Sequence, residues 1–508
     1  MELTWFYLIS IASILSLLLL KLLQQKQSSP KITPPSPPPL PIIGHLHLIK
    51  QPLHRTLEKL SQQYGPIFTL RFGSRPVLIL SSPSAIEELF SKNDLIFANR
   101  PRRLAGKHIH YNYTTIGSSS YGEHWRNLRR LTTLEIFSTT KLNLFLGIRQ
   151  EEVRSLLRNL SRSLRKSFVK IEMKSRISTM LYNTIMRILS GKRYYGIDEK
   201  DSEEATEFRE IIRNVSELSA ALHLGDFVPS LRWVDFGKLE KRMLTTKKKM
   251  DAILQGLIDE NRSEDTEVLH SNGGKAKSMI NSMLGLQNSD PQYYSDEIIK
   301  GTILSLLGAG TDTSASTIEW ALSLLLNHPD VLDKARAELD VVIGEDRLAD
   351  ESDLSKLPYL QNIINETLRL FPAAPLLLPH ESSDDCTIGG FQVERGTMLL
   401  VNAWAIHRDP KVWEYPTSFR PERFEGVEIE AYKLLPFGIG RRSCPGAGLA
   451  NRVVGLALAT LIQCFEWERI SEELVDMSEG QGVTISKAKP LEAMCRARER
   501  MVNVLSEL

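Results

Sequence analysis

The sequence predicts a mainly α-helical protein with a minor set of β-strands, built as one large domain behind an N-terminal transmembrane helix. Apolar residues recur at helical spacing over most of residues 142–287, and again over 296–327 and 447–465. Short runs such as "IFTLRFGSRPVLIL" and "TIGGFQVERGTMLLVN" predict only a few strands. No change of composition divides the rest of the chain, so a single domain is expected over residues 43–508.

The N-terminal segment predicts a membrane anchor over residues 1–24 and a proline-rich hinge over residues 25–42. The run "LTWFYLISIASILSLLLLKLL" has about the length of a bilayer-spanning helix, and only Lys21 interrupts it. A cleaved signal peptide is the alternative, but the chain lacks the basic n-region of such peptides. Positive charge at Lys21, Lys26 and Lys31 places the following chain in the cytosol. The prolines of "PPSPPPLP" favour an extended, semi-rigid spacer over a disordered linker.

Charge and cysteine content exclude several classes of function. The net charge is +2 and the chain contains no long basic run, so nucleic acid is not an expected partner. Cys386, Cys444, Cys464 and Cys495 are widely spaced and form no CxxC pair. This arrangement argues against a disulfide framework or a zinc site, and it fits a reducing compartment.

The loop "FGIGRRSCPG", residues 437–446, combines a cysteine with features that suit a thiolate. Its glycines permit tight turns and the close approach of a flat ligand. The apolar helix that follows places Cys444 near a helix N-terminus, where free N–H groups lower the pKa of a thiol. Arg442 lies on the same side as Cys444 in an extended chain, ready for an anion. An iron porphyrin with carboxylate arms fits this set, and a buried structural cysteine is the alternative.

The order Phe437-x-x-Gly440-x-Arg442-x-Cys444-x-Gly446 resembles the haem-binding loop of cytochromes P450. The resemblance implies a single large P450 fold and a haem b whose iron is bound by the Cys444 thiolate. It also implies that Phe437, Arg442 and Gly446 contact the cofactor, with Arg442 pairing with a propionate.

A second motif of that family is found in "NETLRL", where Glu366 and Arg369 are neighbours on one helical face. A surface ion pair is the alternative, but the surrounding residues are apolar and favour a buried pair. By resemblance, a later arginine completes the structural set, and "FRPERF" offers Arg423 in preference to Arg420.

The predicted helix over 296–327 carries "SLLGAGTDTSAS", in which polar residues interrupt an apolar run. Threonines that bond back to helix carbonyls are one interpretation. The match to the family's oxygen-activation motif is the other. It implies that Ala309 and Gly310 leave room for O2 and border the cofactor and substrate. It also makes Thr313 and Asp312 the catalytic residues, with Thr313 holding a water and Asp312 serving a proton relay.

The helix "YGEHWRNLRR" places Trp125 and Arg129 on one face. By resemblance these two residues reach the haem propionates, together with Arg442 and with His380 of "LLLPHES". Arg126 and Arg130 are expected to face outward, where with Arg441 they form a basic surface for an acidic electron-donor protein.

The segments "PHESSDDCTIGGF" and "LLPFGIGRRSCPGAGLA" are similar in sequence to plant microsomal P450s. The similarity is greatest to the family that contains isoflavone hydroxylases and the sesame lignan enzyme that forms methylenedioxy bridges. The resemblance implies a haem-thiolate monooxygenase in the endoplasmic reticulum membrane, single-pass and with a cytosolic catalytic domain. Electrons would come from NADPH through NADPH–cytochrome P450 reductase. Hydroxylation of a hydrophobic isoflavonoid, flavonoid or related phenylpropanoid is expected. Alternatives are terpenoid or fatty-acid hydroxylation, bridge formation, or a membrane-anchored haem carrier or sensor.

The resemblance also indicates which segments face the substrate. These are the loop "RRLAGKHIHYNYTTIG", residues 222–227, residues 304–313, the run "PAAPLLL" and the neighbourhood of Val483. They are largely apolar, which suits an aromatic or polycyclic molecule. For His108 and His110, exposure on a loop is an equal alternative.

Overall fold

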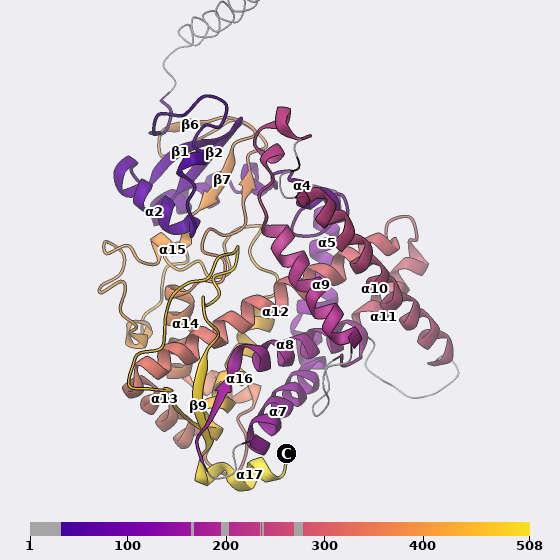
Figure 1. The fold of residues 1–508 in the computed structure, drawn as a ribbon, viewed down its shortest axis with the longest axis vertical. Helices are drawn as coiled ribbons and strands as arrows, with labels where there is room; N and C mark the ends of the chain where they lie inside the picture. Colours follow the sequence, from indigo (N-terminus) through magenta and orange to yellow (C-terminus); the bar gives the residue numbers. More distant parts are fainter. Residues whose placement is uncertain (1–31, 164–166, 195–202, 234, 236–237, 269–277) are drawn as a thin grey trace, which may run out of the picture.

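The computed structural model describes residues 32–508 except 164–166, 195–202, 234, 236–237 and 269–277. The predicted anchor over 1–24, the first part of the predicted hinge and the glycine-rich loop "SNGGKAK" lie outside the described residues. The larger sheet lies at one end of the molecule, the C-terminus lies at the other, and helices fill the space between them (Figure 1).

The larger sheet has the strand order β1-β2-β7-β4. The predicted Gly-Ser turn joins β1 (Ile67–Phe72) to β2 (Arg75–Leu80) as an antiparallel pair. Strand β7 (Met398–Val401) pairs in parallel with β2, and β4 (His380–Glu381) pairs with β7. Because β4 begins at His380, this sheet fixes one residue of the predicted site.

The described part of the proline-rich segment packs on the body and does not stand apart from it. The Thr69 N–H donates to the carbonyl of Pro35, and the Gln392 N–H donates to that of Ile32. The buried ring of His45 bonds to the carbonyl of Pro37 over 2.8 Å. A proline-rich strand has free carbonyls that accept such bonds. Contact with the body therefore already begins at Ile32, within the predicted hinge.

The sequence reading did not predict the second sheet, whose order is β3-β9-β8. Strand β9 (Glu492–Ala497) pairs with β3 (Val169–Glu172) and with β8 (Phe465–Glu468), both antiparallel. Strands β5 (Cys386–Ile388) and β6 (Phe391–Val393) form a separate hairpin.

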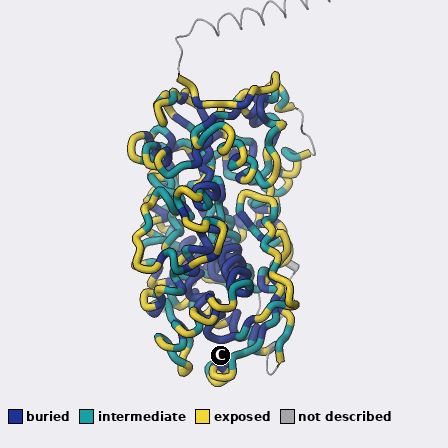
Figure 2. Tube along the Cα trace, turned by 90° about the vertical axis from the view of Figure 1, so that its left-hand side faces the viewer, coloured by how far each residue is buried: buried dark blue, intermediate teal, exposed yellow. Residues whose placement is uncertain are grey.

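Helix α12 (Asp296–Asn327) has the predicted bounds and runs through the centre of the molecule. It packs against α8 (Met173–Ser190), α14 (Pro358–Leu370) and α16 (Ala447–Cys464). Figure 2 shows buried chain, in dark blue, in the interior of the fold, with exposed segments in yellow around it. The other helices are α2 (Leu53–Tyr64), α3 (Pro83–Lys92), α4 (Leu104–His108), α5 (Glu123–Thr132), α6 (Thr139–Leu144), α7 (Leu146–Ser163), α9 (Glu203–Ala220), α10 (Leu239–Val268), α11 (Met279–Ser289), α13 (Pro329–Val342), α15 (Ala403–Ile406) and α17 (Val502–Ser506).

Helix α16 is long and apolar enough to cross a membrane, with a mean hydropathy of 1.4. It is instead a core helix, since most of it is buried against α7, α12 and α13. Within the described ranges no second helix meets the same test. The start of α16 directly after Gly446 places the end of the cysteine loop at a helix N-terminus.

Candidate active site

A cavity of about 550 Å³ lies between α12, the cysteine loop and the segment that precedes α5. Its wall is mainly apolar, which suits a hydrophobic ligand. All the cofactor and catalytic residues predicted from the sequence line it: Trp125, Arg129, Ala309, Gly310, Asp312, Thr313, His380, Phe437, Arg442, Cys444 and Gly446.

Backbone geometry presents the Cys444 side chain to this cavity. Gly438 and Gly440 have φ values of 65° and 74°, the left-handed region that favours glycine. A Cβ atom at Gly440 would lie 2.5 Å from Oδ1 of Asp94, so a larger residue does not fit there. The Cys444 N–H donates to the Phe437 carbonyl over 2.8 Å and closes the loop. The thiol is exposed, but to the cavity.

The protonation of Cys444 differs from the sequence-based expectation. Burial raises the pKa of this thiol, and the N–H groups of Gly446 and Ala447 and the charge of Arg129 only partly offset that effect. The expectation of a net lowered pKa is therefore wrong for the protein alone, because desolvation of the thiolate outweighs the helix N-terminus. A bound metal cation reverses the balance, since a coordinating thiol is deprotonated.

Arg442 lines the cavity and forms no ion pair with an acid in the described part of the chain. Its guanidinium donates to the carbonyls of Ala98, Ile116 and Ser119 at 2.7, 3.2 and 2.6 Å, and lies 4.5 Å from the ring centroid of Trp125. Burial, followed by the charge of Arg129, lowers the pKa of Arg442 to about 10. A buried cation held only by carbonyls favours an anionic ligand.

The other predicted carboxylate-binding residues are also held by backbone groups. Arg129 donates to the carbonyl of Ser443 over 2.7 Å, next to Cys444. His380 bonds through Nδ1 to the carbonyl of Phe97 over 2.7 Å, and burial lowers its pKa to about 3. Because the carbonyl only accepts, Nδ1 carries the proton of the neutral ring.

Sequence reasoning missed Arg100, a third arginine of this group. It is 7% exposed, lines the cavity and donates to the carbonyls of Leu378 and Pro379. Its Nε has no hydrogen-bond partner among the described residues. Arg100, Arg129 and Arg442 together fit a ligand with carboxylate groups, and the thiol fits iron, so the site suits haem. No local signal in the sequence marks Arg100, because its carbonyl partners lie far along the chain at Leu378 and Pro379.

On α12 the structure separates the three polar residues of the predicted oxygen-activation motif. Thr311 is fully buried and bonds back to the Leu307 carbonyl. Thr313 also bonds back, to the Ala309 carbonyl at 2.6 Å, as the first interpretation expects, and it lines the cavity. Asp312 accepts a long bond of 3.5 Å from Ser216, and burial raises the pKa of its carboxyl. A raised pKa suits a carboxyl that holds and releases a proton.

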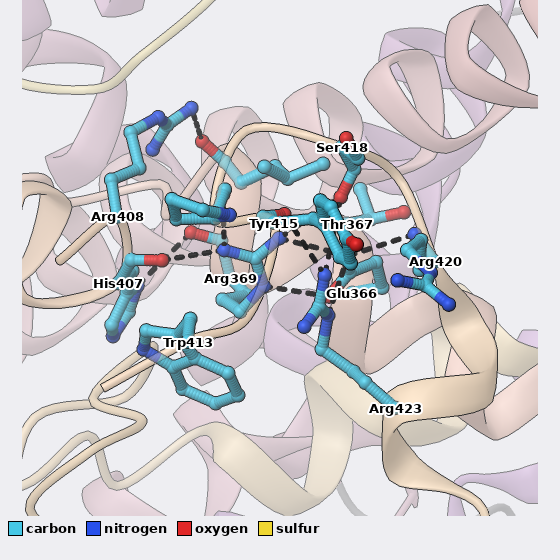
Figure 3. Close-up of polar contacts among 12 residues, drawn as sticks. Glu366, Thr367, Arg369, His407, Arg408, Trp413, Tyr415, Ser418, Arg420 and Arg423 are labelled. Carbon is cyan, nitrogen blue, oxygen red and sulfur yellow. Dashed lines mark hydrogen bonds and ion pairs between the residues drawn. The ribbon is translucent and has the colours of Figure 1, made fainter. Parts of the chain in front are cut away.

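Glu366, Arg369 and Arg423 form a cluster of charged side chains, called the brace below, that joins α14 to the segment before the cysteine loop (Figure 3). Arg369 donates two bonds, of 2.7 and 2.8 Å, to Glu366, and both side chains are fully buried. Arg423 donates through Nε to Glu366 over 3.0 Å. Arg420 offers only its backbone N–H to that carboxylate, while its guanidinium lies over Tyr415. Such a pair is costly to break, because each partner would leave an uncompensated buried charge.

The predicted substrate-facing segments line the cavity with one exception. Residues 304–313 line the cavity except for Leu307 and Thr311. Ala373, Val483 and His110 also line it, and His110 bonds to Ser219 over 3.0 Å. His108 instead bonds to Glu240 and does not line the cavity. The expectation for residues 222–227 is wrong, because Phe227 packs against Phe72. Helix α9 contributes Val215, Ser216, Ser219 and Ala220 in their place, and α8 contributes Leu181, Thr184, Ile185, Ile188 and Leu189.

Comparisons with known proteins agree with this geometry. The cytochrome P450 family matches residues 34–494. An isoflavone 3'-hydroxylase of Medicago truncatula is 56% identical over 472 residues, covering 92% of this chain and 93% of that protein. The (+)-piperitol/(+)-sesamin synthase of Sesamum radiatum is 52% identical over 477 residues, covering 94% and 92%. The structure of a zebra fish cytochrome P450 with progesterone has a TM-score of 0.76 at 28% identity, covering 88% of this chain and all of that one.

The fold and the site thus define a haem-thiolate oxidoreductase. The chain belongs to the cytochrome P450 family and is a monooxygenase. The haem carrier or sensor without turnover is thereby set aside.

Proposed function

We propose that this monooxygenase hydroxylates an isoflavonoid or a closely related phenylpropanoid, using electrons from NADPH. The observation that supports this most is the largely apolar cavity around Cys444 in a chain 56% identical to an isoflavone 3'-hydroxylase. When bound, the haem iron supplies activation of O2 for insertion of one oxygen atom. The second atom leaves as water, and NADPH provides two electrons.

The residues of the chain divide this work between them. Cys444 would hold the iron, and Arg100, Arg129, Arg442 and His380 would bind the propionates. Trp125, Phe437 and Gly446 would pack on the porphyrin, and the small residues Ala309 and Gly310 would leave space for O2. A Cβ at Gly446 would lie 3.9 Å from the Cys444 sulfur and 3.5 Å from Phe137, which supports close packing there.

Proton delivery falls to Asp312 and Thr313. The Thr313 hydroxyl donates its proton to the Ala309 carbonyl, so its oxygen is left to accept a hydrogen bond from a water. Asp312 lies next to it with a raised carboxyl pKa and passes protons inward. The apolar wall excludes bulk water from this relay.

The proposal is tested with microsomes that contain the protein and a plant NADPH–cytochrome P450 reductase. Isoflavones, flavanones and lignans are incubated singly, and products are identified by mass and by NMR. A hydroxylated isoflavone that requires NADPH supports the proposal. Absence of any isoflavonoid product, in a preparation with a normal reduced CO-bound spectrum, would refute the substrate class.

Methylenedioxy-bridge formation is a second candidate, supported by the 52% identity to (+)-piperitol/(+)-sesamin synthase. This reaction also consumes O2 and NADPH, but it closes a ring between a phenol and a neighbouring methoxyl group. The same incubations separate the two outcomes, because hydroxylation adds the mass of one oxygen and ring closure removes two hydrogens.

We also propose that residues 1–24 anchor the protein in the endoplasmic reticulum membrane and that residues 25–42 orient its catalytic domain in the cytosol. The apolar run over 3–23 supports this, as does the lysine-rich segment after it. Removal of residues 1–24 is expected to shift the protein from the membrane pellet toward the supernatant while the reduced CO-bound spectrum persists.

NADPH–cytochrome P450 reductase is the proposed electron donor. Arg126 and Arg130 are exposed on α5, on the helix that carries Trp125 and Arg129 into the cavity. All four residues line a small hollow on the surface, together with Thr133 and Leu134. A basic surface this close to the cysteine loop fits an acidic partner that must bring an electron near the cofactor.

A further inference from the structure

Arg103 is an arginine of the cavity wall whose charge has no partner in the described protein and is not needed for the haem propionates. It immediately precedes α4, lines the cavity and is partly buried. Among the described residues its side chain has no hydrogen bond and no ion-pair contact. The carboxylate of Asp226 attracts it from a distance, but that group accepts the Leu104 N–H over 2.8 Å. Burial outweighs this attraction and lowers the pKa of Arg103.

The remaining cavity arginines differ from Arg103 in this respect. Arg100, Arg129 and Arg442 each donate to backbone carbonyls at 2.6–3.2 Å. Those bonds fix each guanidinium in place. Arg103 has all five of its donors open, and leaving a desolvated charge without a partner costs free energy. A ligand that brings an acceptor oxygen would recover that cost.

Next to Arg103 the cavity wall carries a second polar pair. His110 Nε2 bonds to Ser219 Oγ over 3.0 Å, which joins the loop after α4 to α9. Burial and then the charge of Arg103 lower the pKa of His110 to about 4. The ring is therefore neutral at neutral pH and can either donate or accept a hydrogen bond. Ser216 and Ser219 lie one turn apart on α9, and both line the cavity.

These polar groups lie in a different part of the cavity wall from the residues proposed to bind the haem propionates. Arg442 is two residues from Cys444, and Arg129 bonds to the carbonyl beside it. Arg103 is instead associated with Asp226 and His110, and through His110 with α9. A porphyrin of this type carries two propionates, and Arg100, Arg129, Arg442 and His380 already suffice for them.

We propose that Arg103, together with the His110–Ser219 pair, is a substrate-recognition subsite for the ring carbonyl oxygen and a neighbouring hydroxyl of the substrate. The proposal rests on the proposed function, since an isoflavone carries both groups on a flat aromatic frame. Arg103 donates to the acceptor oxygen, and His110 and Ser219 hydrogen-bond a neighbouring hydroxyl. Holding the polar end of the substrate in this way turns its apolar end toward the cofactor.

The test is a spectral titration of the purified holoprotein with a matched pair of ligands. One ligand is a hydroxylated isoflavone, and the other is the isoflavan that lacks its ring carbonyl. Wild type is expected to bind the isoflavone more tightly. In Arg103→Met the Kd for the isoflavone should rise at least about tenfold, while the Kd for the isoflavan changes little. Ser219→Ala should weaken both ligands modestly, because both keep their hydroxyls.

Arg102→Met is the matched control, because Arg102 is the exposed neighbour and lies over the ring of Tyr113. It should leave both Kd values unchanged. Haem content per protein is measured for each variant, and it should be equal in wild type, Arg103→Met and Arg102→Met.

Three results would overturn the proposal, and they can be distinguished. Equal Kd values in wild type and Arg103→Met for the isoflavone refute the subsite alone. Loss of haem from Arg103→Met with unchanged ligand discrimination assigns the guanidinium to a propionate. A wild type with full haem content that binds neither ligand refutes the isoflavonoid assignment and the subsite with it.

Discussion

The backbone N–H of Leu435 donates a hydrogen bond of 2.8 Å to Nε2 of His407, a side chain without solvent exposure. Because the Leu435 nitrogen only donates, Nδ1 carries the ring proton and donates to the carbonyl of Arg369 over 3.1 Å. Arg369 in turn donates through Nη1 to the His407 carbonyl (Figure 3). His407 therefore joins the buried brace to the chain that enters the Cys444 loop.

Removing this link should loosen the cysteine loop. In His407→Leu the Leu435 N–H loses its acceptor, which costs about 1–3 kcal/mol of unfolding free energy. We expect a lower midpoint in urea and a larger fraction of reduced, CO-bound protein without the strongly red-shifted Soret band. His407→Gln retains a donor and an acceptor and should recover part of both losses. Identical spectra for His407→Leu and wild type would contradict this role.

The same residue gives the stability a defined pH dependence. Burial, and then the charges of Arg369 and Arg408, lower the pKa of His407 from 6.5 to about 3. The folded protein keeps the ring neutral where the unfolded chain binds a proton, so this contribution is present above pH 6.5 and is lost as the pH falls toward 3. His407→Gln should show a shallower fall in unfolding free energy over that interval. An unchanged slope would refute the assignment.

Glu366 is the anion on which the brace depends. In Glu366→Gln two arginines lose their charge partner inside the core, and we expect a loss of about 3–5 kcal/mol in stability with poor haem incorporation. Arg420→Ala is the control, because its guanidinium does not contact Glu366. Urea denaturation followed by far-UV circular dichroism gives both values. Similar losses in the two variants would mean that the charge pair is not the source of the effect.

The proton relay is tested on α12. Asp312→Asn and Thr313→Val should each reduce the rate of product formation at least about tenfold, because general acid catalysis typically contributes more than that. NADPH consumption should fall less than product, as electrons are diverted without oxygen insertion. Thr311→Val is the control, since that hydroxyl is buried and does not line the cavity. Equal coupling of NADPH to product in all three variants would exclude the relay.

Reductase docking is tested by charge reversal on α5. Arg126→Glu combined with Arg130→Glu should raise the reductase concentration needed for half-maximal turnover several-fold at low salt and less at high salt. Turnover driven by an artificial peroxide donor should be unchanged. Lys249→Glu on α10 provides a charge-reversal control outside α5. A response of the control as large as that of the double variant would place docking elsewhere.

The features that the sequence predicted correctly depend on residues that are close together in the chain. The end of α12 follows from His328-Pro329 after it, and the predicted bounds match the structure. The turn between β1 and β2 and the helix that starts behind Gly446 were likewise set by neighbouring residues. The Glu366–Arg369 pair was readable because the two residues lie one helical turn apart.

What the sequence could not predict depends on distant packing. The carbonyl partners of Arg100 lie at Leu378 and Pro379, so nothing near Arg100 in the chain reveals its role. Strand β9 pairs with β3 across more than half the chain. The pKa of Cys444 depends on how completely the fold buries the thiol, and local reasoning considered only the helix N-terminus.

The most direct test of the proposed function is incubation of the protein, its reductase and NADPH with an isoflavone under isotopically heavy O2. The proposed function predicts a hydroxylated isoflavone that carries one heavy oxygen, with no product from Cys444→Ala. An isoflavonoid product without heavy oxygen, or no isoflavonoid product from a wild type with a strongly red-shifted reduced CO-bound band, would contradict it.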